Sequence, residues 1–106
     1  TPYFVMKVGH VPLVPYHHPG AAEAADWVAQ AIATYGQAGK PLRAVMLARL
    51  GPNVWHDTPF AAMATLEELE ETAKLWLMHS ARDQASIQPL SPEQINELKQ
   101  RFGANW

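Results

Sequence analysis

The chain has 106 residues, which is enough for one domain but not for two. Hydrophobic residues make up 48% of it, so a packed core is expected and intrinsic disorder is disfavoured. The formal net charge is −2, and the eight lysines and arginines are scattered along the chain. This distribution argues against nucleic acid as a partner, because binding to a phosphate backbone needs concentrated positive charge.

No cysteine is present, which rules out disulfides and thiolate metal sites and agrees with a cytoplasmic location. No apolar run approaches the roughly 20 residues that span a bilayer, so no membrane segment is expected. The chain opens at Thr1 without a methionine and directly in a strand-like run. From this start we expect a fragment or a processed chain.

The first two apolar runs predict a β-hairpin. Tyr3–Val8 is rich in β-branched and aromatic residues, Gly9-His10 supplies a turn, and Val11–Val14 is the second run. Pro12 and Pro15 cannot donate hydrogen bonds to a sheet. We therefore expect the second strand to be short or to lie at an edge.

The next part predicts a helix followed by two strands. Apolar residues recur with helical spacing from Ala21 to about Tyr35. Ala44–Ala48 is a continuous apolar run, as expected for a buried central strand. Gly51-Pro52 is expected to break this strand, and Asn53–Trp55 is expected to return as a second one.

A long amphipathic helix is predicted from Thr58-Pro59 to about His79. Threonine is a good N-cap, and proline is favoured at the first helical position. The acidic run Glu67–Glu71 lies mostly on the outer face of this helix. We interpret it as a solvated surface rather than as a catalytic pair of carboxylates.

A second helix is predicted after a polar connector from Arg82 to Leu90. Ser91-Pro92-Glu93-Gln94 has the pattern of a capping box, and Gly103 supplies the stop. The predicted order is therefore ββ-α-ββ-α-α, which is an α/β fold.

Histidines are the candidate metal ligands besides carboxylates, and the chain has five, His10, His17, His18, His56 and His79. None of them forms an H-x-H or H-x-x-x-H pair, the spacings that place two imidazoles on one face. We interpret them as exposed loop residues, with His79 as a cation near a helix C-terminus. Residue chemistry alone thus indicates an α/β domain with no visible active site.

Longer strings resemble the class II aldolase/adducin family. They occur in the family's order, as Pro2–Gly9, Val11–Tyr16, Pro19-Gly20, Ala44–Trp55 and Glu67–Lys74. The tail, Pro89–Ile95 with Arg101–Trp106, is similar to the branch of 3-oxo-tetronate 4-phosphate decarboxylases. The resemblance covers nearly all of residues 1–106, but it corresponds to about the C-terminal half of such an enzyme.

The resemblance implies an α/β/α sandwich around a mostly antiparallel sheet, assembled as a homo-oligomer. It implies a lyase that acts on a phosphorylated sugar acid with a divalent metal, typically zinc, held by histidines. Two of those histidines belong to an H-x-H motif in the first half of the family, which this chain lacks. In the family the metal polarises the substrate carbonyl and stabilises the enediolate left by C–C cleavage.

The resemblance also implies that a metal ligand is missing at position 50. The family's third histidine stands in a string of the form L-x-N-H-G-P, and Leu47–Pro52 puts Leu50 in its place. Leucine has no lone pair, so we expect this chain alone to bind no metal and to be inactive. Arg49 replaces the usual asparagine and would add positive charge, whereas His56 stands where the family usually has glycine and is an alternative ligand.

Tyr3 is the one residue that the resemblance carries over as catalytic. It aligns with a tyrosine that reaches an active site near a subunit boundary and acts as an acid or a transition-state stabiliser. The alternative is a strand tyrosine that packs in the core or at an interface.

Three hypotheses remain open from the sequence. The chain is part of a metal-dependent lyase whose N-terminal half is absent or separate, or it is a non-catalytic, adducin-like structural module, or position 50 is an alteration of the sequence. A half-domain would leave a sheet edge and an apolar patch uncovered, so we expect a dimer or a partner chain.

Overall fold

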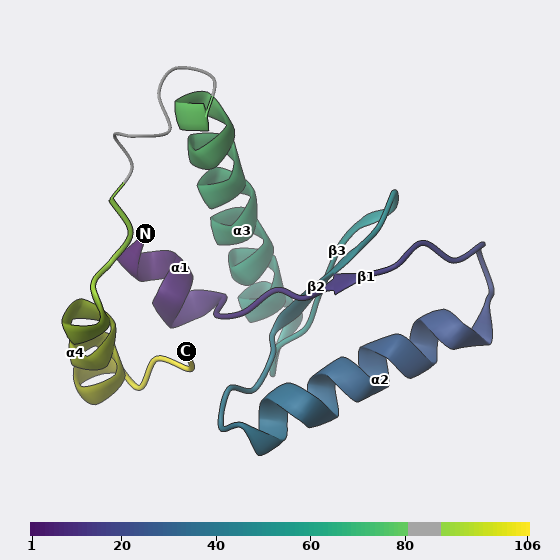
Figure 1. The fold of residues 1–106 in the computed structure, drawn as a ribbon, viewed down its shortest axis with the longest axis horizontal. Coiled ribbons are helices and arrows are strands. Elements are labelled where there is room, and N and C mark those ends of the chain that lie inside the picture. The colour runs from purple at the N-terminus through teal and green to yellow at the C-terminus, as the bar shows by residue number, and fades with distance from the viewer. Residues whose placement is uncertain (81–87) are drawn as a thin grey trace.

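The computed structural model describes residues 1–80 and 88–106. Its elements in chain order are α1 (Pro2–Lys7), β1 (Leu13–Val14), α2 (Ala22–Gln37), β2 (Ala44–Leu47), β3 (Gly51–Val54), α3 (Pro59–Ser80) and α4 (Pro92–Phe102). The helices are arranged around a small sheet (Figure 1). Residues 81–87, most of the connector expected between the last two helices, lie outside the described residues.

The run that begins the chain is a helix, so the predicted strand over Tyr3–Val8 and its hairpin are wrong. The Thr1 hydroxyl accepts a hydrogen bond from the Phe4 N–H at 3.0 Å, and Pro2 occupies the first turn. A threonine cap followed by proline is a helix start. The helix buries Val5 and, at its end, Val8. Burial of this face outweighs the strand propensity of the side chains.

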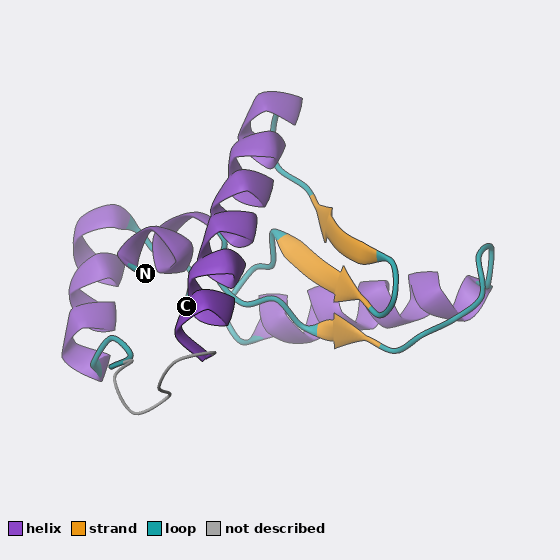
Figure 2. Ribbon diagram, turned by 90° about the horizontal axis from the view of Figure 1, so that it is seen from above, coloured by secondary structure: helices purple, strands orange, loops and turns teal. Residues whose placement is uncertain are grey.

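The sheet has the order β1-β2-β3 and is mixed (Figure 2). β1 runs parallel to β2, with Leu13 opposite Met46. β2 and β3 are antiparallel, with Ala44 opposite Val54. The prediction of a short strand at an edge is confirmed for β1, as is the central position of β2. The expected return of the chain as a second strand is confirmed, but the break lies at residues 48–50, and β3 already begins at Gly51.

Hydrophobic clusters lie on both faces of the sheet. Ala44 packs with Val8 and with Leu69 of α3. Val45, the next residue along β2, packs with Val14 and with side chains of α2. Successive side chains of a strand point to opposite faces, so α1 and α3 cover one face and α2 covers the other (Figure 1). The predicted α/β sandwich is therefore confirmed.

The three longer helices lie where their sequence signals place them. α2 turns Val28, Ala31 and Tyr35 toward the sheet. In α4 the Ser91 hydroxyl accepts from the Gln94 N–H while the Gln94 side chain accepts from the Ser91 N–H, which is the predicted capping box. Among the described residues, none of the helices is both long and apolar enough to span a bilayer.

Candidate functional site

The turn between β2 and β3 carries Leu50, the position at which the resemblance implies a metal ligand. Leu47 pairs with Gly51 across the hairpin, and residues 48–50 form the turn between them. The Leu50 N–H donates to the Leu47 carbonyl at 3.1 Å, and Arg49 has a φ of 63°. The Leu50 side chain is 80% exposed at this tip. A side chain at position 50 therefore projects from the sheet, but a leucine offers a metal no lone pair there.

Tyr3 lies on α1 rather than on a strand, and its side chain is 59% exposed. The ammonium of Lys7 lies 5.5 Å from the centre of its ring. Figures 1 and 2 show α1 and the turn between β2 and β3 on different sides of the molecule. A single copy of the chain thus presents Tyr3 on its surface and does not bring it to position 50.

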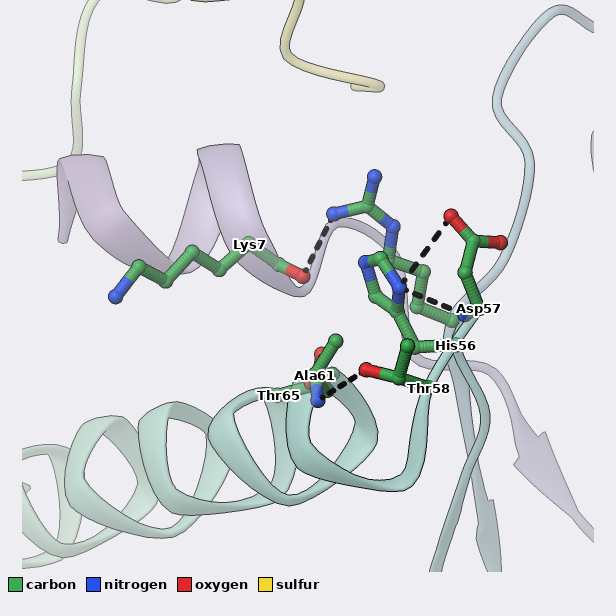
Figure 3. A network of polar contacts seen from close by, with 7 residues as sticks. Lys7, His56, Asp57, Thr58, Ala61 and Thr65 are labelled. Carbon is green, nitrogen blue, oxygen red and sulfur yellow. Dashed lines mark hydrogen bonds and ion pairs between the residues drawn. The ribbon is translucent and has the colours of Figure 1, made fainter.

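His56 follows β3, and its imidazole is hydrogen-bonded to the backbone of the next residue, Asp57 (Figure 3). Nδ1 accepts a hydrogen bond from the Asp57 N–H at 2.8 Å, and the Asp57 carboxylate lies 3.8 Å from the same nitrogen. Since Nδ1 uses its lone pair in this contact, only Nε2 is left to ligate a metal. Within residues 1–80 and 88–106, no three histidine, aspartate or glutamate side chains lie close enough to hold an ion together. The described residues do not fit a zinc site.

The interpretation of the remaining histidines as exposed loop residues is only partly right. His18 is exposed, and His79 lies in the last turn of α3 as predicted, with Nδ1 3.0 Å from a carbonyl of the preceding turn. His10 and His17 are half-buried instead, and Nε2 of each is buried without a hydrogen-bond partner in the described part of the chain. His10 is covered because aromatic rings from α2 and the C-terminal tail pack against it.

The acidic run on α3 is largely surface, as predicted, but Glu68 has a structural role. Its Oε1 accepts hydrogen bonds from the Thr1 hydroxyl at 3.1 Å and the Thr72 hydroxyl at 3.2 Å. The first contact joins the start of α1 to α3. On the exposed face of α3, Lys74 lies 3.6 Å from the carboxylate of Glu71.

A polar pocket of about 330 Å³ lies beside His56 and was not predicted from the sequence. Its lining includes Arg43, Trp55, His56, Asp57 and Asn105. Arg43 Nη1 donates to the Lys7 carbonyl at 3.3 Å, a contact between residues 36 positions apart. No local spacing in the sequence signals such a contact.

A larger groove of about 720 Å³ is lined by residues of α1, the second half of α3 and α4. Its walls are mainly apolar and include Phe4, Leu75, Trp76, Ile95 and Trp106. Trp76 is 60% exposed, although its spacing along the helix predicts the inner face. This half of α3 therefore presents apolar surface that the described residues leave uncovered.

The comparison with known proteins agrees with the resemblance seen in the sequence. The chain is 46% identical to the 3-oxo-tetronate 4-phosphate decarboxylase of Cupriavidus necator, a match that covers 100% of this chain and 46% of that protein. It is 41% identical to the protein of the same name from Pectobacterium atrosepticum, over 92% of this chain and 40% of that one. The chain therefore spans less than half the length of these curated relatives.

Solved structures of the same type share the fold. The Escherichia coli protein YgbL, whose description names aldolase, epimerase and decarboxylase as candidate activities, superposes with a TM-score of 0.72. The two sequences are 36% identical, and the match covers 93% of this chain and 43% of that one. YgbL from Klebsiella pneumoniae gives a TM-score of 0.70 at 40% identity, over 92% of this chain and 42% of that one.

Residues 1–77 also match the family described as "Class II Aldolase and Adducin N-terminal domain". This match includes α1, the whole sheet and most of α3. The chain belongs to the class II aldolase and adducin family.

Proposed function

We propose that this chain is part of a sugar-acid-phosphate lyase of the 3-oxo-tetronate 4-phosphate decarboxylase type and is inactive on its own. The observation that carries the proposal is the 46% identity to such a decarboxylase over the full length of the chain. Relatives with this name do not favour the adducin-like alternative. The chain corresponds to the C-terminal half in this proposal and acts in the cytoplasm.

The inactivity follows from the side chains at the tip of the hairpin. Leu50 leaves the family's third ligand position without a donor atom, and the described residues hold no other cluster that fits a cation. Zinc would therefore depend on ligands from the remaining half of the longer protein. Arg49 carries positive charge next to position 50 and disfavours a cation at the tip.

The chemistry of the proposed substrate defines what the assembled enzyme has to do. A 3-oxo acid loses its carboxylate as CO₂ when the C1–C2 bond breaks, and the electron pair passes to the C3 carbonyl oxygen as an enediolate. A proton then returns to C2. The phenol of Tyr3 is the proton donor that we assign to this chain, and its exposure on α1 makes it available to a site on a neighbouring subunit.

The proposal is tested by placing a histidine at position 50 and supplying the N-terminal half of a relative as a second chain. The chain is co-expressed with the first half of the Cupriavidus necator relative, and zinc content and CO₂ release from 3-oxo-tetronate 4-phosphate are measured. We expect zinc binding and activity with Leu50→His and neither with the unaltered chain.

A matched control is Leu13→His, because Leu13 is a second exposed leucine of the same sheet. It should leave zinc content unchanged. If the chain with Leu50, paired with the first half of the relative, binds zinc stoichiometrically and is active, then Leu50 does not prevent zinc binding or catalysis. No zinc in the Leu50→His pair would show that the ligand assignment is wrong.

A further inference from the structure

The pocket beside His56 contains the cationic side chain of Arg43. Arg43 lies directly before β2 and is half-buried. Its Nη1 donates a hydrogen bond to the Lys7 carbonyl at the end of α1. A guanidinium has several N–H groups, so this contact orients the group and leaves other donors free. Within the described ranges, no ion pair involves Arg43.

His56 supplies a second donor to the same pocket. Because Nδ1 accepts the Asp57 N–H at 2.8 Å, the neutral ring carries its proton on Nε2. Figure 3 shows this second nitrogen turned away from Asp57, on the side of the Lys7 carbonyl. The side chain of His56 is 22% exposed, so this donor is partly shielded from water.

From these donors we infer that the pocket is a binding site for a small oxyanion, a carboxylate or a phosphate group. A guanidinium and an imidazole N–H offer hydrogen-bond donors and positive charge, which carboxylate and phosphate oxygens accept. The volume of about 330 Å³ is at the lower end of the range for small-molecule sites. Trp55 and, from the C-terminal tail, Asn105 also line the pocket.

The negative charge of Asp57 disfavours the binding of an anion in this pocket. Its side chain is 98% exposed and lies against the Nδ1 edge of His56. Water screens a carboxylate in this position, so its repulsion of an anion bound at Nε2 is weak. The aspartate lowers the affinity without abolishing binding.

The anion site is separate from the position of the family's third metal ligand. Arg43 precedes β2, whereas Leu50 follows its other end. A strand rises about 3.3 Å per residue, so the length of β2 alone separates the two by about 13 Å. The inference does not rest on the proposed lyase function and can fail or hold independently of it.

The experiment titrates the purified chain with inorganic phosphate and, in a second arm, with acetate. Binding is followed by calorimetry and by the NMR shift of the Asp57 amide, which reports on the His56 ring. We expect saturable binding of at least one ion. Saturation by phosphate alone assigns a phosphate group, saturation by acetate alone assigns a carboxylate, and saturation by both assigns a general oxyanion site.

Four variants connect binding to the named side chains. Arg43→Gln should weaken it by about tenfold, the effect of losing one charged contact. His56→Gln should weaken it less, and Asp57→Asn should tighten it. Arg49→Gln is the matched control, because it removes a similar charge from the other end of the hairpin and should leave affinity unchanged.

Absence of saturable binding in both arms would overturn the inference. Equal weakening in Arg49→Gln and Arg43→Gln would do so too, because it would show a non-specific charge effect. Circular dichroism checks that each variant is folded. If Arg43→Gln does not fold, unchanged affinity in His56→Gln overturns the inference.

Discussion

The imidazole of His10 stacks on the indole of Trp106, with ring centroids 4.5 Å apart and planes inclined by 25°. Trp106 also meets Phe4 of α1 edge-on at 6.5 Å, and Tyr35 of α2 lies 5.4 Å from His10. These ring contacts pack the tail after α4 against the turn after α1. Aromatic pairs of this kind contribute about 0.5–1.5 kcal/mol each beyond their buried area.

The environment of His10 predicts that the protein is less stable at acidic pH. Burial, followed by the positive charges of Lys40 and Lys99, lowers the pKa of His10 below its ordinary value of 6.5. The unfolded chain therefore takes up a proton before the folded chain does. The free energy of unfolding should fall as the pH drops below about 6.5 and level off below the folded-state pKa.

Urea unfolding at about pH 7.5 and about pH 5.5 measures this loss. His10→Phe keeps an aromatic ring but cannot be protonated, so it should lose less stability between the two pH values than the wild type. His18→Phe is the control, because His18 is exposed, and it should behave as the wild type does. Equal losses in the wild type and in His10→Phe would contradict the assignment.

Gly9→Ala is predicted to be strongly destabilising. Gly9 has a φ of +78°, which is unfavourable for an alanine, and a Cβ there would lie 2.9 Å from the Asn105 carbonyl oxygen. Strain and the displaced tail together should cost about 2–4 kcal/mol in the free energy of unfolding. Thermal and urea denaturation measure the change.

Gly36→Ala provides the comparison for this substitution. Gly36 lies within α2, and a Cβ there meets no atom within 4 Å. Alanine should stabilise the helix by about 0.5–1 kcal/mol. Similar effects of the two substitutions would show that the tail does not contact Gly9 closely in solution.

Arg49→Asn is predicted to stabilise the hairpin. Arg49 is a non-glycine residue with a φ of 63°, a conformation that asparagine tolerates better than arginine. The asparagine that the resemblance implies at this position would fit that requirement. We expect a gain of about 0.5–1 kcal/mol in urea denaturation.

The matched control is Arg101→Asn, because Arg101 is also exposed but lies in α4. It pairs with Glu97 at 2.9 Å, so asparagine there should lose about 0.5 kcal/mol. A loss of stability in Arg49→Asn would mean that the arginine side chain makes a contact that outweighs its backbone strain.

The sequence predicted most of the elements, and the exception at α1 has a specific cause. Thr58-Pro59 and Thr1-Pro2 carry the same helix-start signal, but the aromatic and β-branched residues that follow Thr1-Pro2 favour a strand. The capping hydrogen bond of Thr1 and the burial of Val5 decide the structure. Local propensity does not contain that burial, because the surface that covers Val5 comes from later parts of the chain.

The candidate site was predictable in part. The resemblance identifies position 50 as the place of a metal ligand. The structure places the leucine side chain found there at an exposed turn. Arg43 was not predicted, because a single arginine before an apolar strand has no distinctive spacing. Its orientation depends on the Lys7 carbonyl, which only the folded chain brings near.

Tyr3→Phe tests the proposed proton donor in the active pair of halves that carries Leu50→His. Removing the phenolic O–H should lower kcat by about 10²-fold, the usual contribution of a general acid, with little effect on zinc content. Tyr16→Phe is the control, because the two tyrosines have nearly equal exposure, 59% and 60%. Equal rates in Tyr3→Phe and in its parent would remove Tyr3 from the catalytic machinery.

The exposed apolar side chains in the second half of α3 predict self-association of the isolated chain. Trp76, Leu75 and Met78 are exposed there, next to the apolar groove. Soluble monomers rarely expose a large contiguous apolar surface, so sedimentation at micromolar concentration should show a dimer or a larger species.

Trp76→Lys should shift the chain toward the monomer, because it puts a charge into the contact. Trp27→Lys changes an exposed tryptophan on α2, across the sheet from α3, and should leave the distribution as it was. A monomer in the unaltered chain would mean that this face is covered only by the remaining half of the longer protein.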